Sequence, residues 1–536
     1  MSRSSLARNP SPSAFVTLSG VAARTPDGRT LFENLSLSLG RERTGIVGRN
    51  GTGKTTLLDL IAGDGAPAEG HIVRNGSIAR LRQDAGAVPG QTVAAALGVE
   101  AAQARLARIL AGDGTADDLA EADWTLEARL EAALAAVGLG GLAPAREAAT
   151  LRGGERTRLA LAALELAGAD LILLDEPTNH LDAEGGARVA ERLGQWPGGA
   201  VVVSHDRALL RQMDRIVELS PLGVTVYGGN YDLYAERKAI ERAAAEHNLA
   251  VAESEVARTA ADAQRRAEGK ARRDRAGRKK GMKGDMPKIL RDFRAETAEN
   301  SAGHDARLAA RQAAEAEQTL VAARERVERV RRMTLPLPET GLAAGRQVLT
   351  LQGVRVDGER GLRVGPVDLR LTGAERVAIT GPNGSGKTTL LDLIAGRIMP
   401  SAGTVECAVP LALLDQHAGL LRDDETLIEA WQRLNPDGTL NDAQAALARF
   451  LFRNVEAHKR VGTLSGGERL RAALACVMTG TRPPQLLVLD EPTNHLDLDA
   501  IEAVEAALAA WDGALVVVSH DRDFLDAVGI EREIRL

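Results

Sequence analysis

The sequence TGIVGRNGTGKTTLL, residues 44–58, decides the fold class of this chain. Residues 48–55 match the pattern G-x-x-x-x-G-K-[ST], with an apolar run before them and a helix-like run after them. In this strand–loop–helix setting the glycines let backbone N–H groups approach phosphates, and the helix start adds positive partial charge. We expect Lys54 to reach the β- and γ-phosphates of a nucleotide and the Thr55 hydroxyl to hold Mg²⁺. A chance glycine-rich turn could explain one such loop, so the other motifs must decide whether this loop binds a nucleotide.

Two carboxylates stand at the end of a second apolar run, LILLDEPT, residues 171–178. Asp175 fits a magnesium-binding carboxylate at the tip of a buried strand. Glu176 is placed to act as general base on an attacking water. A strand followed by an acidic helix cap would explain the same residues without any catalysis.

Two further stretches are candidates for the same site. The run AVVVSHD, residues 200–206, delivers His205 to the C-terminal end of a strand, where ligands of open α/β sheets gather. Gly153 and Gly154 open a helical pattern and so form a second helix start suited to an anion. Each of these signals is weak by itself.

The second half of the chain contains all of these features again, in the same order. GPNGSGKT begins at Gly381, LSGGER at Leu464, DEPTNHLD at Asp490 and SHDR at Ser519. A glutamine after each loop is repeated as well. The first copy is about 20 residues longer between its glutamine and its Gly-Gly motif, and we expect a small inserted helix pair there. Five motifs repeated in one order indicate two copies of one domain.

The composition excludes several classes of protein. A chain of 536 residues is too long for one core. No apolar run is long enough for a membrane-spanning helix, and residues 1–14 lack the apolar core of a secretory signal, so we expect a disordered tail. Cys407 and Cys476 are the only cysteines, which argues against disulfide, zinc and iron–sulfur frameworks. A reducing, cytoplasmic setting fits.

Residues 228–338, between the two copies, differ from both copies in amino-acid composition. Within them, residues 265–294 hold 13 Lys/Arg against 4 Asp/Glu, a net charge of +9, while the whole chain is −6. Both flanks of this basic stretch are rich in strong helix formers. We predict two antiparallel helices of about 45 residues and roughly 65 Å each, reversing near Gly277, Gly281 and Gly284.

Each predicted helix has an apolar seam along which the two could pack. The seam of the second helix is Leu320, Ala323, Val327 and Val330. The seam of the first helix is weaker, with Ile240, Ala244, His247 and Val251.

The basic tip of this hairpin suggests a polyphosphate partner, bound through counterion release. Phe293 is its only aromatic residue, so base stacking cannot dominate, and recognition of backbone and shape suits structured RNA. A solvated charge run that keeps a helix tip soluble is the alternative.

Taken together, the motifs resemble ATP-binding cassette domains, with Walker A, Q-loop, signature, Walker B, D-loop and switch histidine in order. Two cassettes in one chain, DEPTNHLD in both, no membrane segment and a charged helical linker resemble the ABC-F family. The resemblance implies an α/β fold: two P-loop ATP-binding cassette domains joined by a long α-helical hairpin linker. The expected domains are the tail 1–14, a first cassette 15–227, the linker 228–338 and a second cassette 339–536.

The resemblance also implies the site residues of an ATPase with ATP and Mg²⁺. The expected catalytic residues are Glu176, Glu491, His205 and His520. The expected metal ligands are Thr55, Gln83, Asp175, Thr388, Gln416 and Asp490. The expected nucleotide-binding residues of the Walker A loops and Q-loops are Gly48, Arg49, Asn50, Gly51, Thr52, Gly53, Lys54, Thr55, Thr56, Gly381, Pro382, Asn383, Gly384, Ser385, Gly386, Lys387, Thr388, Thr389, Gln83 and Gln416. Those of the signatures are Arg152, Gly153, Gly154, Glu155, Ser465, Gly466, Gly467 and Glu468.

In cassette proteins two cassettes pack head to tail, so each nucleotide lies between one Walker A and the other signature. Arg152 replaces the serine expected in the first signature, whereas Ser465 keeps the residue that would bond the γ-phosphate, so the two sites should differ. Cassette proteins also stack adenine on an aromatic residue upstream of Walker A. Thr25 and roughly Val356 stand there and neither is aromatic, which weakens the expected selectivity for adenine.

For function, the resemblance implies a monomeric chain that binds the ribosome in its ATP-closed state, without membrane insertion. The linker tip would contact ribosomal RNA and the P-site tRNA, and hydrolysis would release the protein. Both a housekeeping translation factor and a factor protecting the ribosome from antibiotics remain open. The alternatives are the ATP-driving subunit of a membrane transporter with separate membrane chains, and a DNA-associated cassette ATPase.

Overall fold

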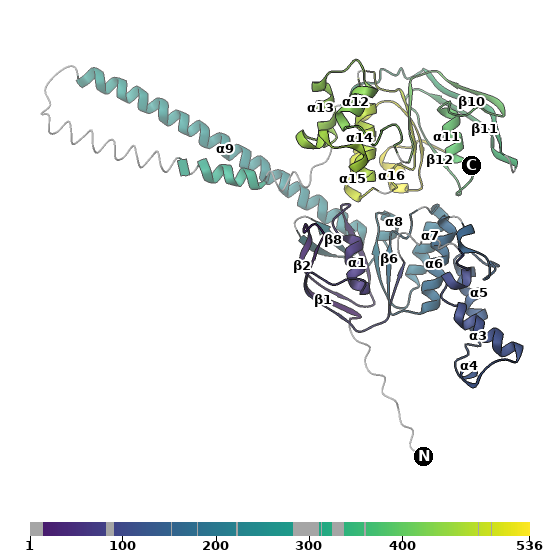
Figure 1. Ribbon diagram of the computed structural model, residues 1–536. Helices are drawn as coiled ribbons and strands as arrows, with labels where there is room; N and C mark the ends of the chain where they lie inside the picture. The colour runs from purple at the N-terminus through teal and green to yellow at the C-terminus, as the bar shows by residue number, and fades with distance from the viewer. Residues whose placement is uncertain are drawn as a thin grey trace. The chain divides into compact units, whose positions relative to one another are not determined.

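The structure is a computed structural model that describes residues 14–81, 90–151, 153–179, 181–220, 223–281, 310–311, 313–323, 337–358, 361–416, 418–480, 482–494 and 496–536. Gln83 and Arg152 of the expected site lie outside these residues. The chain divides into two compact units, Met1–Leu233 with Met333–Leu536, and Tyr234–Arg332 (Figure 1). Among the residues described, no helix is both long and apolar enough to span a membrane.

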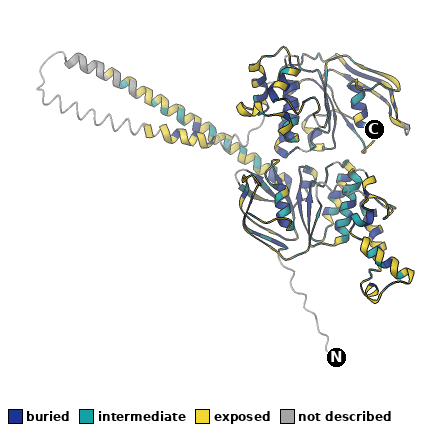
Figure 2. Ribbon diagram, viewed as in Figure 1, coloured by how far each residue is buried: buried dark blue, intermediate teal, exposed yellow. Residues whose placement is uncertain are grey.

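The first cassette is built on a six-stranded sheet with the order β5-β6-β7-β3-β8-β9. Its strands are parallel except for the antiparallel pair β8 and β9. Every residue of β6 and β7 is buried, because parallel strands are covered on both faces and so read as continuous apolar runs (Figure 2). The bounds are β3 Arg43–Gly48, β5 Ile78–Leu81, β6 Leu171–Asp175, β7 Gly199–Val203, β8 Arg215–Ser220 and β9 Gly223–Gly228.

A smaller antiparallel sheet, β2-β1-β4, packs its apolar side chains with α1 and the main sheet of this cassette. Phe32, Leu35 and Leu37 of β2 share one buried core with Leu57 of α1 and Leu173 of β6. This core fixes the position of α1, which begins at the end of the glycine-rich loop. The bounds are β1 Val16–Arg24, β2 Thr30–Leu39, β4 Glu69–Arg74 and α1 Lys54–Ala62.

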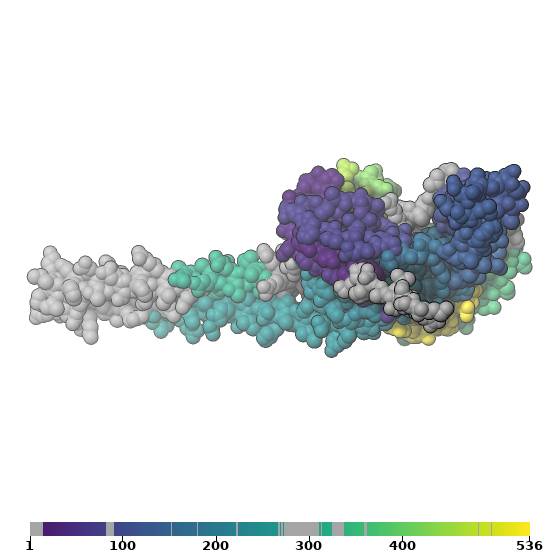
Figure 3. Space-filling view, turned by 90° about the horizontal axis from the view of Figure 1, so that it is seen from below, coloured from purple at the N-terminus to yellow at the C-terminus, as the bar shows by residue number. Residues whose placement is uncertain are grey.

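The remaining helices of the first cassette include the inserted pair that the longer spacing predicts. The pair, α3 and α4, is held together by ion pairs of Arg105 and Arg108 with Asp118. The pair projects beyond α5 in Figure 1 and belongs to the dark-blue region of the surface in Figure 3. The bounds are α2 Val93–Ala96, α3 Glu100–Ala111, α4 Ala116–Ala120, α5 Leu126–Ala136, η1 Ala148–Thr150, α6 Gly153–Ala167, α7 Ala183–Gly194 and α8 Arg207–Leu210.

The second cassette repeats this architecture. A parallel sheet β14-β15-β16-β12-β17 and an antiparallel sheet β11-β10-β13 hold its strands. The strand bounds are β10 Gln347–Gly358, β11 Gly361–Thr372, β12 Arg376–Thr380, β13 Ala402–Cys407, β14 Leu411–Leu414, β15 Leu486–Asp490, β16 Ala514–Val518 and β17 Arg532–Arg535. The helices are α11 Lys387–Ile394, α12 Leu427–Leu434, α13 Leu440–Arg449, η2 Asn454–His458, η3 Val461–Thr463, α14 Gly466–Met478, α15 Leu498–Ala510 and α16 Arg522–Ala527.

The second unit contains most of α9, which spans Tyr231–Gly281. At 51 residues it is longer than the sequence predicts, about 75 Å at 1.5 Å per residue. Residues 310–311 and 313–323 of the returning arm are helical. The helix continues through Gly277 to Gly281, so the chain does not reverse at Gly277 as predicted. Residues 282–294 of the basic stretch, with Gly284, lie outside the described residues.

The seam between the two arms is partly as predicted. Leu320 and Ala323 are buried, as expected, and they pack against Ala252. The seam predicted for the first arm is wrong, because Ile240 and Val251 are 63% and 54% exposed. Ala244 and His247 are exposed as well, and the buried seam of this arm contains Leu249, Ala252 and Val256. Val327 and Val330 lie outside the described residues.

Candidate functional site

Both glycine-rich loops place a lysine at the first position of a helix. Gly53 and Gly386, the residues that cap these helices, have φ of 94° and 98°. A Cβ atom at Gly53 would lie 3.0 Å from Leu31 Cβ. The positive φ and this close approach both favour glycine at the turn. Lys54 and Lys387 are each 8% exposed, and their ammonium groups donate to Gly48 O at 2.6 Å and to Gly381 O at 2.8 Å. Each loop therefore wraps around its own lysine, close to the loop's backbone N–H groups.

A buried aspartate lies beside each loop. Asp175 ends β6 and Asp490 ends β15, and they are 2% and 8% exposed. Thr388 Oγ1 donates to Asp490 Oδ2 at 2.9 Å, and the Thr55 side chain bonds Asp175 in the same way. Burial raises the pKa of both carboxyl groups. Asp175 Oδ2 is buried and has no hydrogen-bond partner among the described residues, which fits an oxygen-seeking cation.

The glutamates that follow these aspartates have a backbone conformation that sequence reasoning missed. Glu176 and Glu491 have φ of 48° and 47°, in the left-handed region. This conformation costs a residue with a side chain about 1–2 kcal/mol. Their N–H groups donate to Val203 O and Val518 O, both at 2.9 Å, which ties each glutamate to the neighbouring strand.

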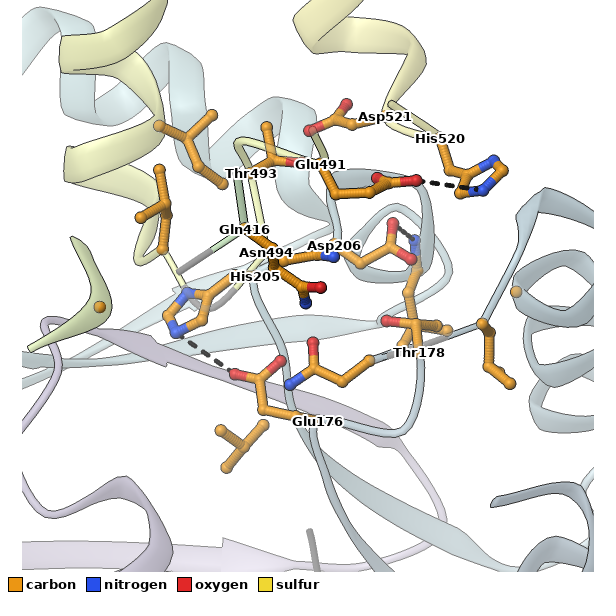
Figure 4. Close-up of a pocket in the computed structure, with 18 of the residues that line it drawn as sticks. Glu176, Thr178, His205, Asp206, Gln416, Glu491, Thr493, Asn494, His520 and Asp521 are labelled. Atoms are coloured by element: carbon orange, nitrogen blue, oxygen red, sulfur yellow. Dashed lines mark hydrogen bonds and ion pairs between the residues drawn. The ribbon is translucent and has the colours of Figure 1, made fainter. Parts of the chain in front are cut away.

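Each glutamate faces the histidine of its own cassette, as Figure 4 shows. Nε2 of His205 lies 3.3 Å from Glu176 Oε1, and Nε2 of His520 lies 3.2 Å from Glu491 Oε1. Burial raises the pKa of Glu176 to about 8 and that of Glu491 to about 7. Burial lowers the pKa of His205 to about 3 and that of His520 to about 4. Each pair is thus neutral, with a proton on the carboxyl group, at moderately acidic pH.

One cavity of about 1190 Å³ is lined by residues of both cassettes. Its lining includes Lys54, Lys387, both glutamates and both histidines, together with Gln416. Ser465 and Gly466 of the second signature line it too. Of the described residues of the first signature, Gly153, Gly154 and Glu155, none lines this cavity. The first Walker A and the second signature therefore line one cavity, whereas the described residues of the first signature do not reach it.

The D-loop aspartates make direct contacts between the cassettes. Asp497 caps α15 and accepts the backbone N–H of Asn50 at 3.0 Å. Asp182 caps α7 and accepts the backbone N–H of Asn383 at 3.1 Å. The same contact thus occurs twice, each time from one cassette to the Walker A of the other. These functional candidates were missed as site residues, although the repeated DEPTNHLD motif contains them.

Ser465 has a structural partner in addition to its expected role. Its hydroxyl donates to Glu468 Oε2 at 2.9 Å and accepts the Glu468 N–H at 3.3 Å. These two contacts form a capping box at the start of α14. The Ser465 hydroxyl therefore donates to Glu468. The sequence predicted that this hydroxyl would instead bond a γ-phosphate.

The region expected to hold the base contains arginine instead of an aromatic residue. Thr25 lines the cavity, as expected, together with Arg29. Val356 does not, because it is 8% exposed and packs in the core. Arg363 also lines the cavity, and its strand passes beside Gly386 of the second loop. Neither guanidinium makes a hydrogen bond or ion pair with any residue in the described part of the chain.

Comparisons with known proteins agree with this architecture. A family model described as "ABC transporter" matches residues 32–179 and 364–494. The tylosin resistance ATP-binding protein TlrC of Streptomyces fradiae is 35% identical over 554 residues, covering 96% of this chain and 95% of that protein. The ATP-binding protein Uup of Escherichia coli (strain K12) is 31% identical, covering 92% of this chain and 76% of that protein.

Solved structures share the fold at lower identity. A structure named RNase-L Inhibitor has a TM-score of 0.59 at 20% identity, covering 96% of this chain and 87% of that chain. A model of ribosome-bound archaeal Pelota and ABCE1 has a TM-score of 0.51 at 21% identity, covering 95% and 74%. The family model matches both cassettes, and the alignment with TlrC covers nearly the whole length of both proteins. The chain therefore belongs to the ATP-binding cassette family, as an ABC-F-type ATPase that binds and hydrolyses ATP.

Proposed function

We propose that this ATPase binds the ribosome while ATP holds its cassettes closed, acts on translation through residues 228–338, and leaves on hydrolysis. In this proposal residues 15–227 and 339–536 are the cassettes of one monomeric chain, residues 1–14 are a tail, and the setting is cytoplasmic. The observation that carries it is the likeness to the tylosin resistance protein TlrC. That likeness covers 96% of this chain and 95% of that protein, so it includes the linker.

ATP would act by shifting the population toward the closed state. A signature reaches the γ-phosphate only when the cassettes are together, so ATP binds the closed state more tightly than the open one. Lys54 of the first Walker A and Ser465 of the second signature line the same cavity, which supports this for the first site. Hydrolysis removes the γ-phosphate and with it the difference in affinity, so the open state returns.

The chemistry of each site would be divided among few residues. Thr55 and Asp175 would hold Mg²⁺ at the first site, and Thr388 and Asp490 at the second, with Gln83 and Gln416 as further ligands. The bound ion would neutralise charge on the phosphates. Glu176 and Glu491 would accept the proton of the attacking water, each kept in place by its histidine. The signature residues would position the γ-phosphate from the opposite cassette.

The basic linker tip would supply the contact with RNA. Residues 265–294 carry a net charge of +9 on a chain of −6, which favours a phosphate backbone. Two solved structures of similar fold contain an archaeal ribosome recycling factor and a ribosome-bound archaeal ABCE1. We propose ribosomal RNA and the P-site tRNA as the contacts of this tip.

Co-sedimentation tests the proposal. The variant Glu176→Gln/Glu491→Gln should pellet with ribosomes in ATP and remain in the supernatant in ADP. The same variant carrying Lys54→Ala and Lys387→Ala is the control, because it should not hold ATP and should not pellet. Retention on membranes or DNA, with no ribosome pelleting at low salt, would favour the transporter or DNA alternative and overturn the proposal.

A second comparison tests the linker. Reversing the charge of Arg278, Lys279, Lys280 and Lys283 to Glu should weaken pelleting and leave ATP hydrolysis without ribosomes nearly unchanged. The matched control reverses four exposed cassette residues, Arg422, Arg449, Arg482 and Arg535. Equal pelleting of the two variants would contradict a role for the tip and leave it as a solvated charge run.

Growth on antibiotic separates the two forms of the proposal. If the chain protects ribosomes, its expression in a tylosin-sensitive strain should raise the tylosin concentration that stops growth. If it is a housekeeping factor, the inhibitory concentration should not change although the protein pellets with ribosomes.

A further inference from the structure

Arg211 joins the second cassette to the first turn of α9. Its guanidinium donates to both carboxylate oxygens of Asp523, at 2.8 and 2.7 Å. Its Nε donates to Asp232 Oδ1 at 2.8 Å. Arg211 directly follows α8 of the first cassette, Asp523 is in the first turn of α16 of the second, and Asp232 is in the first turn of α9. One side chain at the end of α8 therefore contacts two further elements, α16 and α9.

The neighbouring aromatic ring restricts this side chain further. The Arg211 guanidinium carbon lies 5.8 Å from the ring centre of Tyr231, which is 7% exposed. The planar guanidinium can bind a carboxylate with two parallel hydrogen bonds, donate through Nε and lie over a ring at once. A lysine ammonium, a compact point charge, cannot reproduce that arrangement. The geometry is thus particular to arginine.

A short segment connects these contacts to the nucleotide site. His205 faces Glu176 at the start of this segment, and α8 then leads directly to Arg211. Arg207 in between pairs with Glu505 of the second cassette at 2.7 Å. A displacement of the second cassette thus acts on both ends of α8, through Glu505 and through Asp523.

The arrangement occurs on one side of the cassette pair only. In the second copy of the motif, Asp526 stands at the position of Arg211, and the first cassette has Ala208 at the position of Asp523. Neither residue can make the equivalent bond. The internal repeat therefore contains this contact in the copy from which α9 begins and lacks it in the other copy.

We propose that Arg211 is a positioning residue that transmits closure of the cassettes to the start of α9. Asp523 holds the guanidinium while the second cassette is docked, and Asp232 and Tyr231 then fix the first turn of α9 in one orientation. When the cassettes separate, Asp523 leaves and that turn is released. The inference rests on the ATP-driven closure proposed above and names the residues through which closure would reach the linker.

Two spin-label reporters in the full chain test this. The background is Glu176→Gln/Glu491→Gln with Cys407→Ser, because Cys476 is fully buried and will not react. A label at exposed Glu236 reports motion of α9. A label pair at exposed Asp27 and Val455 reports the distance between the cassettes. ATP should shorten the cassette distance and slow the label at position 236.

Arg211→Ala and Asp232→Ala should each abolish the ATP response at position 236 while the cassette distance still shortens, and Arg211→Lys should retain only part of it. Asp232 is 60% exposed, so its replacement tests the link to α9 with little risk to folding. Arg522→Ala is the matched control, because Arg522 pairs with Glu533 inside its own cassette, and it should keep both responses.

Two outcomes overturn the inference, and they differ. If Asp232→Ala and Arg211→Ala respond to ATP as the parent does, closure occurs but Arg211 does not transmit it. If ATP leaves the Asp27–Val455 distance unchanged in the parent, the proposed closure itself is wrong, and the inference falls with it.

Discussion

Arg207 of the first cassette and Glu505 of the second form an ion pair with an N–O distance of 2.7 Å, and their side chains are only 7% and 13% exposed. The repeat does not reproduce it. Arg522, the counterpart of Arg207, pairs with Glu533 of its own cassette, and Ala190 stands at the position of Glu505. Two cassettes with the same motifs thus meet through an interface whose charged contacts are unequal.

Replacement of Arg207 by Ala should destabilise the folded chain, because it leaves the Glu505 carboxylate in a site with little water and no cation. Breaking such a pair typically costs about 3–5 kcal/mol. A double-mutant cycle with Glu505→Ala, followed by denaturant unfolding, should give a coupling free energy of this sign. Arg522→Ala is the control, with an effect near 0.5 kcal/mol expected because the 69% exposed Arg522 side chain is solvated. Equal losses for Arg207→Ala and Arg522→Ala would contradict the buried pairing.

The glutamates should make stability decrease as pH rises. Burial raises the pKa of Glu176 from 4.5 to about 8 and that of Glu491 to about 7. Between pH 7 and 8 the folded state holds protons that the unfolded state has lost, so the free energy of unfolding falls with pH. The histidines do not contribute there, because His205 and His520, with pKa values of about 3 and 4, are neutral when folded, and histidine is largely deprotonated in the unfolded chain.

Glu176→Gln/Glu491→Gln should therefore flatten this slope, a change on the order of 1 kcal/mol per pH unit. The measurement is denaturant unfolding without nucleotide at several pH values from 7 to 8. An identical slope in the parent and the variant would show that these carboxyl groups are already ionised.

Hydrolysis should depend on each glutamate separately. Glu176→Gln should remove general-base catalysis at the first site and Glu491→Gln at the second, an effect of about 10²–10⁴-fold at the affected site. The double variant should hydrolyse ATP at least a hundredfold more slowly than the parent while still binding it, as measured by phosphate release and by calorimetry. Retention of more than half the parental rate in the double variant would exclude both residues as bases.

Arg29 and Arg363 should contribute to binding the base, because they line the cavity where an aromatic residue was expected. A guanidinium over a base is worth about 0.5–2 kcal/mol. Arg29→Ala/Arg363→Ala should weaken binding of ATP and leave binding of inorganic tripolyphosphate unchanged, as measured by calorimetry. Equal weakening for both ligands would instead place these residues at the phosphates.

Ser465→Ala should destabilise the second cassette, because the substitution removes the capping box at the start of α14. Loss of an N-cap costs about 1 kcal/mol. Ser465→Thr keeps the hydroxyl and should recover most of the loss in denaturant unfolding. If Ser465→Ala unfolds at the parental midpoint, the bond to Glu468 contributes nothing to stability.

Much of the fold could be predicted from the sequence because its signals are local. The loop around Lys54 needs glycines, a lysine and a following helix within a few residues, and the repeat at Lys387 removed the chance explanation. The buried runs that end in Asp175 and Asp490 are strands for the same local reason. The family followed from the order of these motifs.

The tertiary structure decided what depends on residues far apart in the chain. The left-handed backbone of Glu176 and its pairing with His205 require two neighbouring strands, and the bond from Asn50 to Asp497 joins residues 447 positions apart. The linker seam runs through Ala252, and Val251 is exposed. Successive helix residues point about 100° apart, so only the packed partner helix selects the buried face.

The sequence by itself determined that the chain has two nucleotide-binding cassettes with a basic helical linker, because each motif carries its own geometry. Only the tertiary structure decided that the cassettes meet unequally, through Arg207 and Glu505 on one side, and that Arg211 connects this side to α9. Charge pairs between distant segments leave no periodic pattern in a sequence. Their formation depends on the placement of whole domains, which the packing of the folded chain sets.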